Sequence, residues 1–323
     1  MKRNLSIESA SSAIPSGGYP LKEPTAPLRP LREPVHFEVA SNRVWGTIDR
    51  PSDDIAGRRV GVVMCNSDDG CRLGPHRLWV RLAERLNAKG FACLRFDYRG
   101  CGDSEGPEGP PPGNVGLQDV LEAEHFLRQR TGVEATVLVG ICYGAEVALL
   151  AGQCRETVRG VVACSVGRYV TSEGYARTVR HARAYLTRYA RKLGQPATWR
   201  KILRGRVAMR TILGGLWTVL SPSAHQRDRT GAIEAEAIVH SHRHRPPSLF
   251  IYGTADPLYP RHGPGYQREA DELRLERSFR CIDGADHNFS RLTWSEQVID
   301  CIESFVETVA HQDGEIRNAS GDG

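Results

Sequence analysis

Residues 137–150, with the sequence VLVGICYGAEVALL, contain the turn that decides the fold. The apolar residues at the start of this stretch predict a buried strand, and those at its end predict a helix. Between them, Gly140 and Gly144 flank Cys142, and glycines at this spacing allow a strand and a helix to approach closely through a sharp turn. The stretch therefore predicts a strand–turn–helix unit with a cysteine at its apex.

Strand and helix patterns alternate on both sides of this turn. Expected strands cover residues 60–65, 91–96, 136–139, 158–165, 248–252 and 278–282, and expected helices cover 77–88, 117–130, 142–153 and 295–309. Residues 36–39 and 43–48 predict an antiparallel hairpin. Strands joined by helices of about 10–15 residues indicate an α/β fold with a mostly parallel sheet that is covered on both faces.

The remaining residues divide the chain into a core, an insertion and two tails. The core is expected at 36–167 and 246–310, and Ser-, Pro- and Gly-rich composition predicts disordered tails at 1–35 and 311–323. Residues 168–245 separate two sheet strands by far more chain than a crossover needs. Apolar residues at steps of three and four predict that this insertion is a helical cap over the active site.

Composition limits the class of protein. The net charge of +5 is mild for 323 residues, so it does not indicate a nucleic-acid partner. No segment is long and apolar enough for an integral membrane span, and the N-terminus has no secretory signal. Nine cysteines, none in a C-x-x-C pair, are more typical of free thiols than of a disulfide framework, which predicts a cytoplasmic protein.

Three residues are candidates for a nucleophile, an acid and a base. Cys142 lies at a helix N-terminus, where the dipole favours a thiolate, although a buried cysteine in a tight turn is the alternative. Asp256 follows one late strand and His287 follows the last strand, and the alternative for Asp256 is an ordinary Asp-Pro turn. Their order along the chain, nucleophile then acid then base, is that of an elbow-type catalytic triad.

A nucleophile of this kind needs an oxyanion hole made of two backbone N–H groups. We expect one from Tyr143 and the other from Asn66 or Ser67, in the loop after the strand 60–65. The stretch DYRGCGDSEG at 97–106 also follows a strand, and its glycines and charged residues predict a structural loop rather than a chemical role.

These motifs together resemble a known superfamily. The stretches FDYRGCGDSEG at 96–106, GICYG at 140–144, YGTADP at 252–257 and GADHNF at 284–289 are similar to the α/β-hydrolase superfamily, in its serine-aminopeptidase-like branch. More narrowly, GPHR at 74–77, LAERL at 82–86 and WRKILRGR at 199–206 resemble exosortase A system-associated hydrolases, which also carry a cysteine at the elbow. The resemblance, over about residues 36–310, implies the α/β-hydrolase fold.

Three functions are open at this point. The first is a cysteine hydrolase that cleaves an ester or thioester through an acyl-enzyme. The second is a Cys-dependent acyltransferase or cyclase that passes the acyl group to an amine or alcohol, and the third is a non-catalytic binding module. None of these functions requires a cofactor. His240, His242 and His244 could suggest a metal site, but their spacing is more typical of a basic loop.

The predicted cap carries the information on substrate and partners. From Arg177 to Arg210 there are 11 Lys or Arg residues and no Asp or Glu. This stretch predicts attraction of an anionic acyl substrate, such as one bound to a carrier protein or to coenzyme A, with Arg177, Arg180 and Tyr185 as candidate contacts. A solvated helix face and attachment to a membrane surface are the alternatives.

Overall fold

The computed structural model describes residues 31–53, 55, 57–67, 70–107, 113–167 and 244–320. Most of the predicted N-terminal tail and almost all of the predicted cap lie outside the described residues, at 1–30 and 168–243.

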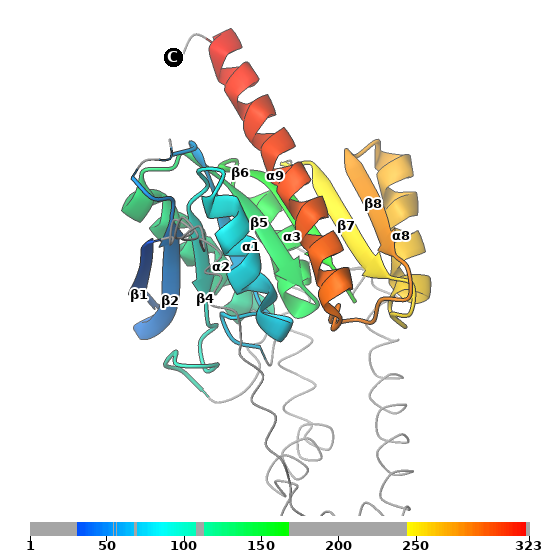
Figure 1. Ribbon diagram of the computed structural model, residues 1–323, viewed down its shortest axis with the longest axis horizontal. Coiled ribbons are helices and arrows are strands. Elements are labelled where there is room, and N and C mark those ends of the chain that lie inside the picture. The colour runs from blue at the N-terminus through cyan, green and yellow to red at the C-terminus, as the bar shows by residue number, and fades with distance from the viewer. Residues whose placement is uncertain are drawn as a thin grey trace, which may run out of the picture.

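Eight strands form one sheet in the order β1-β2-β4-β3-β5-β6-β7-β8 (Figure 1). They are β1 (Leu31–Val39), β2 (Asn42–Arg50), β3 (Val60–Cys65), β4 (Cys93–Phe96), β5 (Ala135–Ile141), β6 (Val158–Cys164), β7 (Ser248–Gly253) and β8 (Arg277–Ile282). The pairs β1–β2 and β2–β4 are antiparallel, and all other neighbours are parallel. This arrangement confirms the expected α/β fold with a hairpin at one edge.

Helices cover both faces of the sheet. They are α1 (Leu78–Asn87), α2 (Gly113–Thr131), α3 (Tyr143–Cys154), α8 (Tyr259–Leu273) and α9 (Leu292–Ser320), and a 3-10 turn (Pro75–Arg77) precedes α1. Buried side chains of α1 and α9 form one hydrophobic cluster on one face. Side chains of α2 and α3, and of α3 and α8, form two further clusters on the other face.

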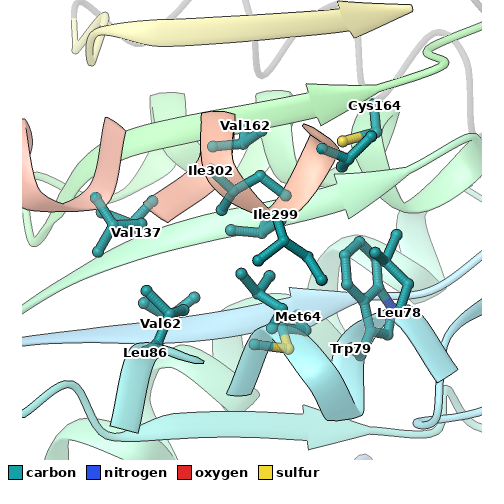
Figure 2. Packing of buried hydrophobic residues seen from close by; sticks show 14 of the residues in the cluster. Val62, Met64, Leu78, Trp79, Leu86, Val137, Val162, Cys164, Ile299 and Ile302 are labelled. Carbon is teal, nitrogen blue, oxygen red and sulfur yellow. The ribbon is translucent and has the colours of Figure 1, made fainter. Parts of the chain in front are cut away.

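The central strands are apolar on both sides because both sides are covered. Val62 and Met64 of β3 point into the cluster with α1 and α9, whereas Val63 and Cys65 belong to the cluster with α2 and α3. Figure 2 shows the first cluster, in which Trp79 packs near Met64 between the sheet and the helices. The two-residue alternation of a strand therefore feeds two cores at once.

A strand and a helix extend into the two predicted tails, at 31–35 and 311–320. β1 begins at Leu31, five residues earlier than the expected strand, because Arg32 pairs with the buried Asp49 of β2 at 2.9 Å. At the other end, α9 continues to Ser320 and extends beyond the sheet (Figure 1). The buried carboxylate of Asp313 on α9 accepts a hydrogen bond from Arg159 of β6 at 3.0 Å, which ties this part of the helix to the core.

Candidate active site

The predicted elbow forms between β5 and α3. Cys142 has φ 53° and ψ −119°, a conformation that side-chain-bearing residues rarely adopt. Its N–H donates to the carbonyl of Cys164 on β6 at 3.0 Å, and its carbonyl accepts from the N–H groups of Ala145 and Glu146. Backbone strain at a single turn residue is typical of functional sites, where neighbouring structure holds it in place.

The two glycines of the elbow are required by close backbone contacts. A Cβ atom on Gly140 would lie 2.3 Å from the carbonyl oxygen of Gly144. A Cβ atom on Gly144 would lie 2.3 Å from the carbonyl oxygens of both Cys65 and Asn66. The end of β3 therefore lies directly against the first turn of α3, and the loop that starts at Asn66 begins beside Cys142.

Asp256 and His287, which follow neighbouring strands, lie together. Nδ1 of His287 is 3.0 Å from Oδ2 of Asp256, and the N–H of Leu258 donates to Oδ1 at 2.9 Å. Burial raises the pKa of the Asp256 carboxyl, but the hydrogen bonds from His287 and Leu258 outweigh it, so this pKa lies below its ordinary value. Asp256 is therefore an anion at neutral pH, fully buried, and paired with one histidine.

His287 connects this carboxylate to Cys142. Burial lowers the pKa of His287, but hydrogen bonds to Asp256 and Cys142 and the electrostatic attraction of both raise it to about 10. Cys142, His287 and Asp256, predicted separately from three distant segments, thus form one connected chain of side chains. A histidine that is linked to a thiol on one side and to a carboxylate on the other can hold or move a proton at the sulfur.

The charge on His287 gives a first prediction. An Asp256→Asn substitution removes the negative charge but not the burial, so we expect the pKa of His287 to fall, and Cys142→Ala should lower it as well. Because the folded pKa exceeds 6.5, the charged pair stabilises the fold fully below pH 6.5, and this contribution is lost as the pH rises through about 10. NMR titration of ¹⁵N-labelled imidazole measures the pKa, and an unchanged value in Asp256→Asn would contradict the described pairing.

The candidate oxyanion donors differ in what their side chains do. The side chain of Asn66 is buried and fully engaged: its amide donates to the carbonyl of Phe96, and its oxygen accepts from the indole of Trp79, both at 2.7 Å. Only the backbone N–H of Asn66 is therefore left as a candidate from that residue, as expected for an oxyanion hole. Ser67 follows it in the same loop, and its carbonyl accepts from Gly70.

The side chain of Tyr143 packs away from the thiol, among residues of the opposite cluster. Its ring meets that of Tyr98 edge to face, with 5.6 Å between centroids. A Cβ atom on Gly116 of α2 would lie 2.1 Å from the Tyr143 hydroxyl oxygen, so α2 leaves room for this ring only at a glycine. The packed ring fixes the backbone of the residue directly after Cys142, where one oxyanion donor is expected.

The predicted structural loop at 97–106 is confirmed. The buried carboxylate of Asp97 binds Arg72 and accepts from the N–H of Asp103, while the hydroxyl of Ser104 donates to the Asp97 carbonyl at 2.7 Å. Arg99 in turn binds the buried Asp119 of α2 through both its backbone and its guanidinium. These charges hold the loop in place, with their polar atoms already paired.

One contact in the site was not expected from the sequence. The hydroxyl of Ser165, the residue after β6, donates to the backbone carbonyl of His287 at 2.9 Å and also hydrogen-bonds the Asp256 carboxylate. In the sequence Ser165 is only the last residue of an expected strand, and no motif marks it.

The remaining predicted positions have simple outcomes. Within the described residues, no group of three His, Cys, Asp or Glu side chains could hold a metal ion, and His244 contacts the carbonyl of Val158 at 2.8 Å. The candidate substrate contacts Arg177, Arg180 and Tyr185 lie outside the described residues, as do His240 and His242. All nine cysteines are free thiols. No helix in the described part of the chain has the length and apolar character needed to cross a membrane.

Comparison with known proteins identifies the family to which the chain belongs. A family model described as the alpha/beta hydrolase family matches residues 62–300, so the chain belongs to that family. No curated protein sequence matches the chain.

Solved structures share the fold at low sequence identity. An esterase from Pyrococcus furiosus is 16% identical with a TM-score of 0.62, covering 88% of this chain and 92% of the esterase. Est1E from Butyrivibrio proteoclasticus, solved with ferulic acid bound, is 16% identical with a TM-score of 0.58, over 85% and 98% of the two chains. A monoacylglycerol lipase from Paleococcus ferrophilus is 19% identical with a TM-score of 0.53, over 82% and 99%.

Proposed function

We propose that the protein is a cysteine-nucleophile hydrolase that cleaves an ester or thioester through an acyl-enzyme on Cys142. The observation that carries this proposal is the connected chain Cys142–His287–Asp256, with 3.0 Å between the histidine and the carboxylate. In the proposed roles, Cys142 attacks the acyl carbon, His287 is the base and acid, and Asp256 orients and stabilises the charged imidazole.

The proposed reaction has two halves. The thiolate forms a bond to the carbonyl carbon, the oxyanion is held by the N–H of Tyr143 and by that of Asn66 or Ser67, and the bond to the leaving group breaks. The leaving group takes a proton from His287, and the acyl group stays on sulfur as a thioester. Water that loses its proton to His287 then attacks this thioester, which releases the free acid and restores the Cys142 thiolate beside the protonated His287. No cofactor enters these steps.

The substrate class in this proposal is a small acyl ester or thioester. The esterase, Est1E and the lipase share the fold with this chain. Two of these proteins are described as an esterase and a lipase, which supports an ester substrate for this fold. The basic stretch from Arg177 to Arg210 supports an anionic leaving group, such as a carrier-protein or coenzyme A thiol. In this proposal, residues 168–245 form a helical cap over the active site.

The proposal also includes a subfamily and a cellular location. We place the chain among hydrolases like those associated with exosortase A systems, on the motifs at 74–77 and 199–206 and on the cysteine at the elbow. A reducing, cytoplasmic location is supported by nine free thiols, including the exposed Cys71 and Cys281.

The cysteine favours a second candidate, a Cys-dependent acyltransferase or cyclase. An acyl group on sulfur is a thioester, which passes readily to an amine or alcohol as well as to water. Incubation of the enzyme and an acyl thioester with increasing amounts of an amine separates the two candidates. We expect free acid as the product at every amine concentration, and an amide that grows with amine concentration would assign the transferase instead.

The third candidate, a binding module without catalysis, has its own test. We expect time-dependent release of acid or thiol from a panel of p-nitrophenyl esters and acyl thioesters of different chain length and charge. Release at the uncatalysed rate for every substrate, by a folded protein with a free Cys142 thiol, would contradict the hydrolase and support the binding module.

A further inference from the structure

The end of β6 lies between the strands that carry the three candidate catalytic residues. β6 pairs with β5, which leads into Cys142, and with β7, after which Asp256 follows. The last residue of β6, Cys164, accepts the N–H of Cys142 through its carbonyl at 3.0 Å. The next residue, Ser165, is completely buried, and its N–H donates to Ile251 of β7 at 2.8 Å.

The hydroxyl of Ser165 reaches the other two residues. It donates to the backbone carbonyl of His287 at 2.9 Å, and its hydrogen bond to the carboxylate of Asp256 contributes to the lowered pKa of that carboxyl. Residues 164 and 165 thus contact all three candidate catalytic residues. The Cys164 carbonyl binds the backbone of Cys142, and the Ser165 hydroxyl binds the main chain of His287 and the carboxylate of Asp256.

The backbone at this point is held in an unusual conformation. Ser165 has φ 47°, in the left-handed region that residues with a Cβ atom rarely adopt. The next residue is also tied down, because the hydroxyl of Tyr252 donates to the carbonyl of Val166 at 3.1 Å. A strained, buried serine that is held on both sides is typical of a position where the surroundings enforce one geometry for function.

We propose that Ser165 is a positioning residue that fixes the His287 loop and the Asp256 carboxylate relative to Cys142. This inference rests on the proposed function, because it assigns Ser165 to the same acyl-transfer site. Without the hydroxyl, the His287 main chain loses its link to the sheet and Asp256 loses one of its donors. The imidazole then moves relative to the thiol, and misplacement by about 1 Å is enough to reduce a rate about 100-fold.

The test compares Ser165→Ala with Ser248→Ala. Ser248 is a matched control, because it is also buried, and its hydroxyl also donates to a backbone carbonyl, that of Pro246 at 3.0 Å, but at the opposite end of β7. We expect Ser165→Ala to lower kcat for hydrolysis of an activated ester about 10- to 100-fold with KM changed less than about threefold. Ser248→Ala should leave both unchanged.

A second readout separates positioning from a purely structural role. Removal of the Ser165 hydroxyl should raise the pKa of the Asp256 carboxyl, measured by ¹³C NMR titration, because one donor to the anion is lost. Ser165→Gly serves where Ser165→Ala folds poorly, since glycine adopts a positive φ without strain and equally lacks the hydroxyl. A kcat within twofold of wild type in the folded variant, with an unchanged Asp256 pKa, overturns the proposal.

Failure of this inference is distinguishable from failure of the proposed function. If Cys142→Ala is inactive while Ser165→Ala and Ser165→Gly are fully active, the hydrolase stands and the role of Ser165 is wrong. If Cys142→Ala retains full hydrolysis, the proposed function is wrong, and the inference about Ser165 is overturned with it.

Discussion

Replacing Cys142 with alanine is expected to reduce kcat for ester or thioester hydrolysis by about 10⁴-fold or more, the usual cost of removing a nucleophile. The alanine variant keeps the oxyanion donors and the His287–Asp256 pair but has no atom that can form the acyl-enzyme. Its fold should be preserved, because the Cys142 thiol caps no backbone group of α3. Initial rates with an activated ester, at equal concentrations of folded protein, measure the effect.

The matched control is Cys154→Ala. Cys154 lies at the other end of the same helix, and its thiol contacts the carbonyl of Leu150 at 3.3 Å. We expect its kcat to equal that of the wild type. A Cys142→Ala enzyme that keeps more than about a tenth of the wild-type rate would contradict the nucleophile role, since nucleophile removal costs several orders of magnitude.

Replacing Gly144 with alanine is expected to lower the free energy of unfolding by about 4 kcal/mol or more, the range of severe core disruptions. The new Cβ atom would lie 2.3 Å from two carbonyl oxygens at the end of β3, and both belong to backbone that cannot rotate away. Either α3 or β3 must move, although β3 is an inner strand of the sheet and α3 is packed against one face of it. Equilibrium unfolding in urea measures the loss.

Gly314→Ala is the control for this substitution. Gly314 lies inside α9, and a Cβ atom added there would meet no neighbouring side chain or strand within 4 Å, so alanine adds helix propensity without a clash. We expect this variant to be more stable by up to about 1 kcal/mol. A Gly144→Ala protein that unfolds within about 1 kcal/mol of wild type would show that the elbow is looser than described.

Much of the fold could be predicted because the central strands repeat a simple pattern. β3, β5, β6 and β7 are short apolar runs that end in turn residues, and their burial on both faces explains this composition. The helix α8 was not predicted, because Pro260, Gly263, Pro264 and Gly265 suppress the helical pattern in its sequence. Tertiary packing of Tyr266 against Phe250, with 4.9 Å between ring centroids, stabilises it instead.

The site could be predicted only where a residue has a local motif. Cys142, Asp256 and His287 each follow a strand and lie in recognisable turns, so their order along the chain was informative. Ser165 has no such signal, and the sequence indicates Asn66 only as a candidate backbone donor, not the contacts of its side chain. The Ser165 hydroxyl binds His287, which is 122 residues away in the sequence, and the Asn66 side chain hydrogen-bonds Phe96 and Trp79. Both sets of contacts are tertiary, so a local motif does not predict them.

The most direct test of the central claim is intact mass spectrometry of acid-quenched reactions with an activated ester and an acyl thioester. Within the first turnover, we expect a mass increase equal to one acyl group, located on the peptide that contains Cys142 and absent from Cys142→Ala. Substrate turnover without this adduct at any quench time, or an acyl group on a different residue, would contradict the assignment of Cys142 as the nucleophile.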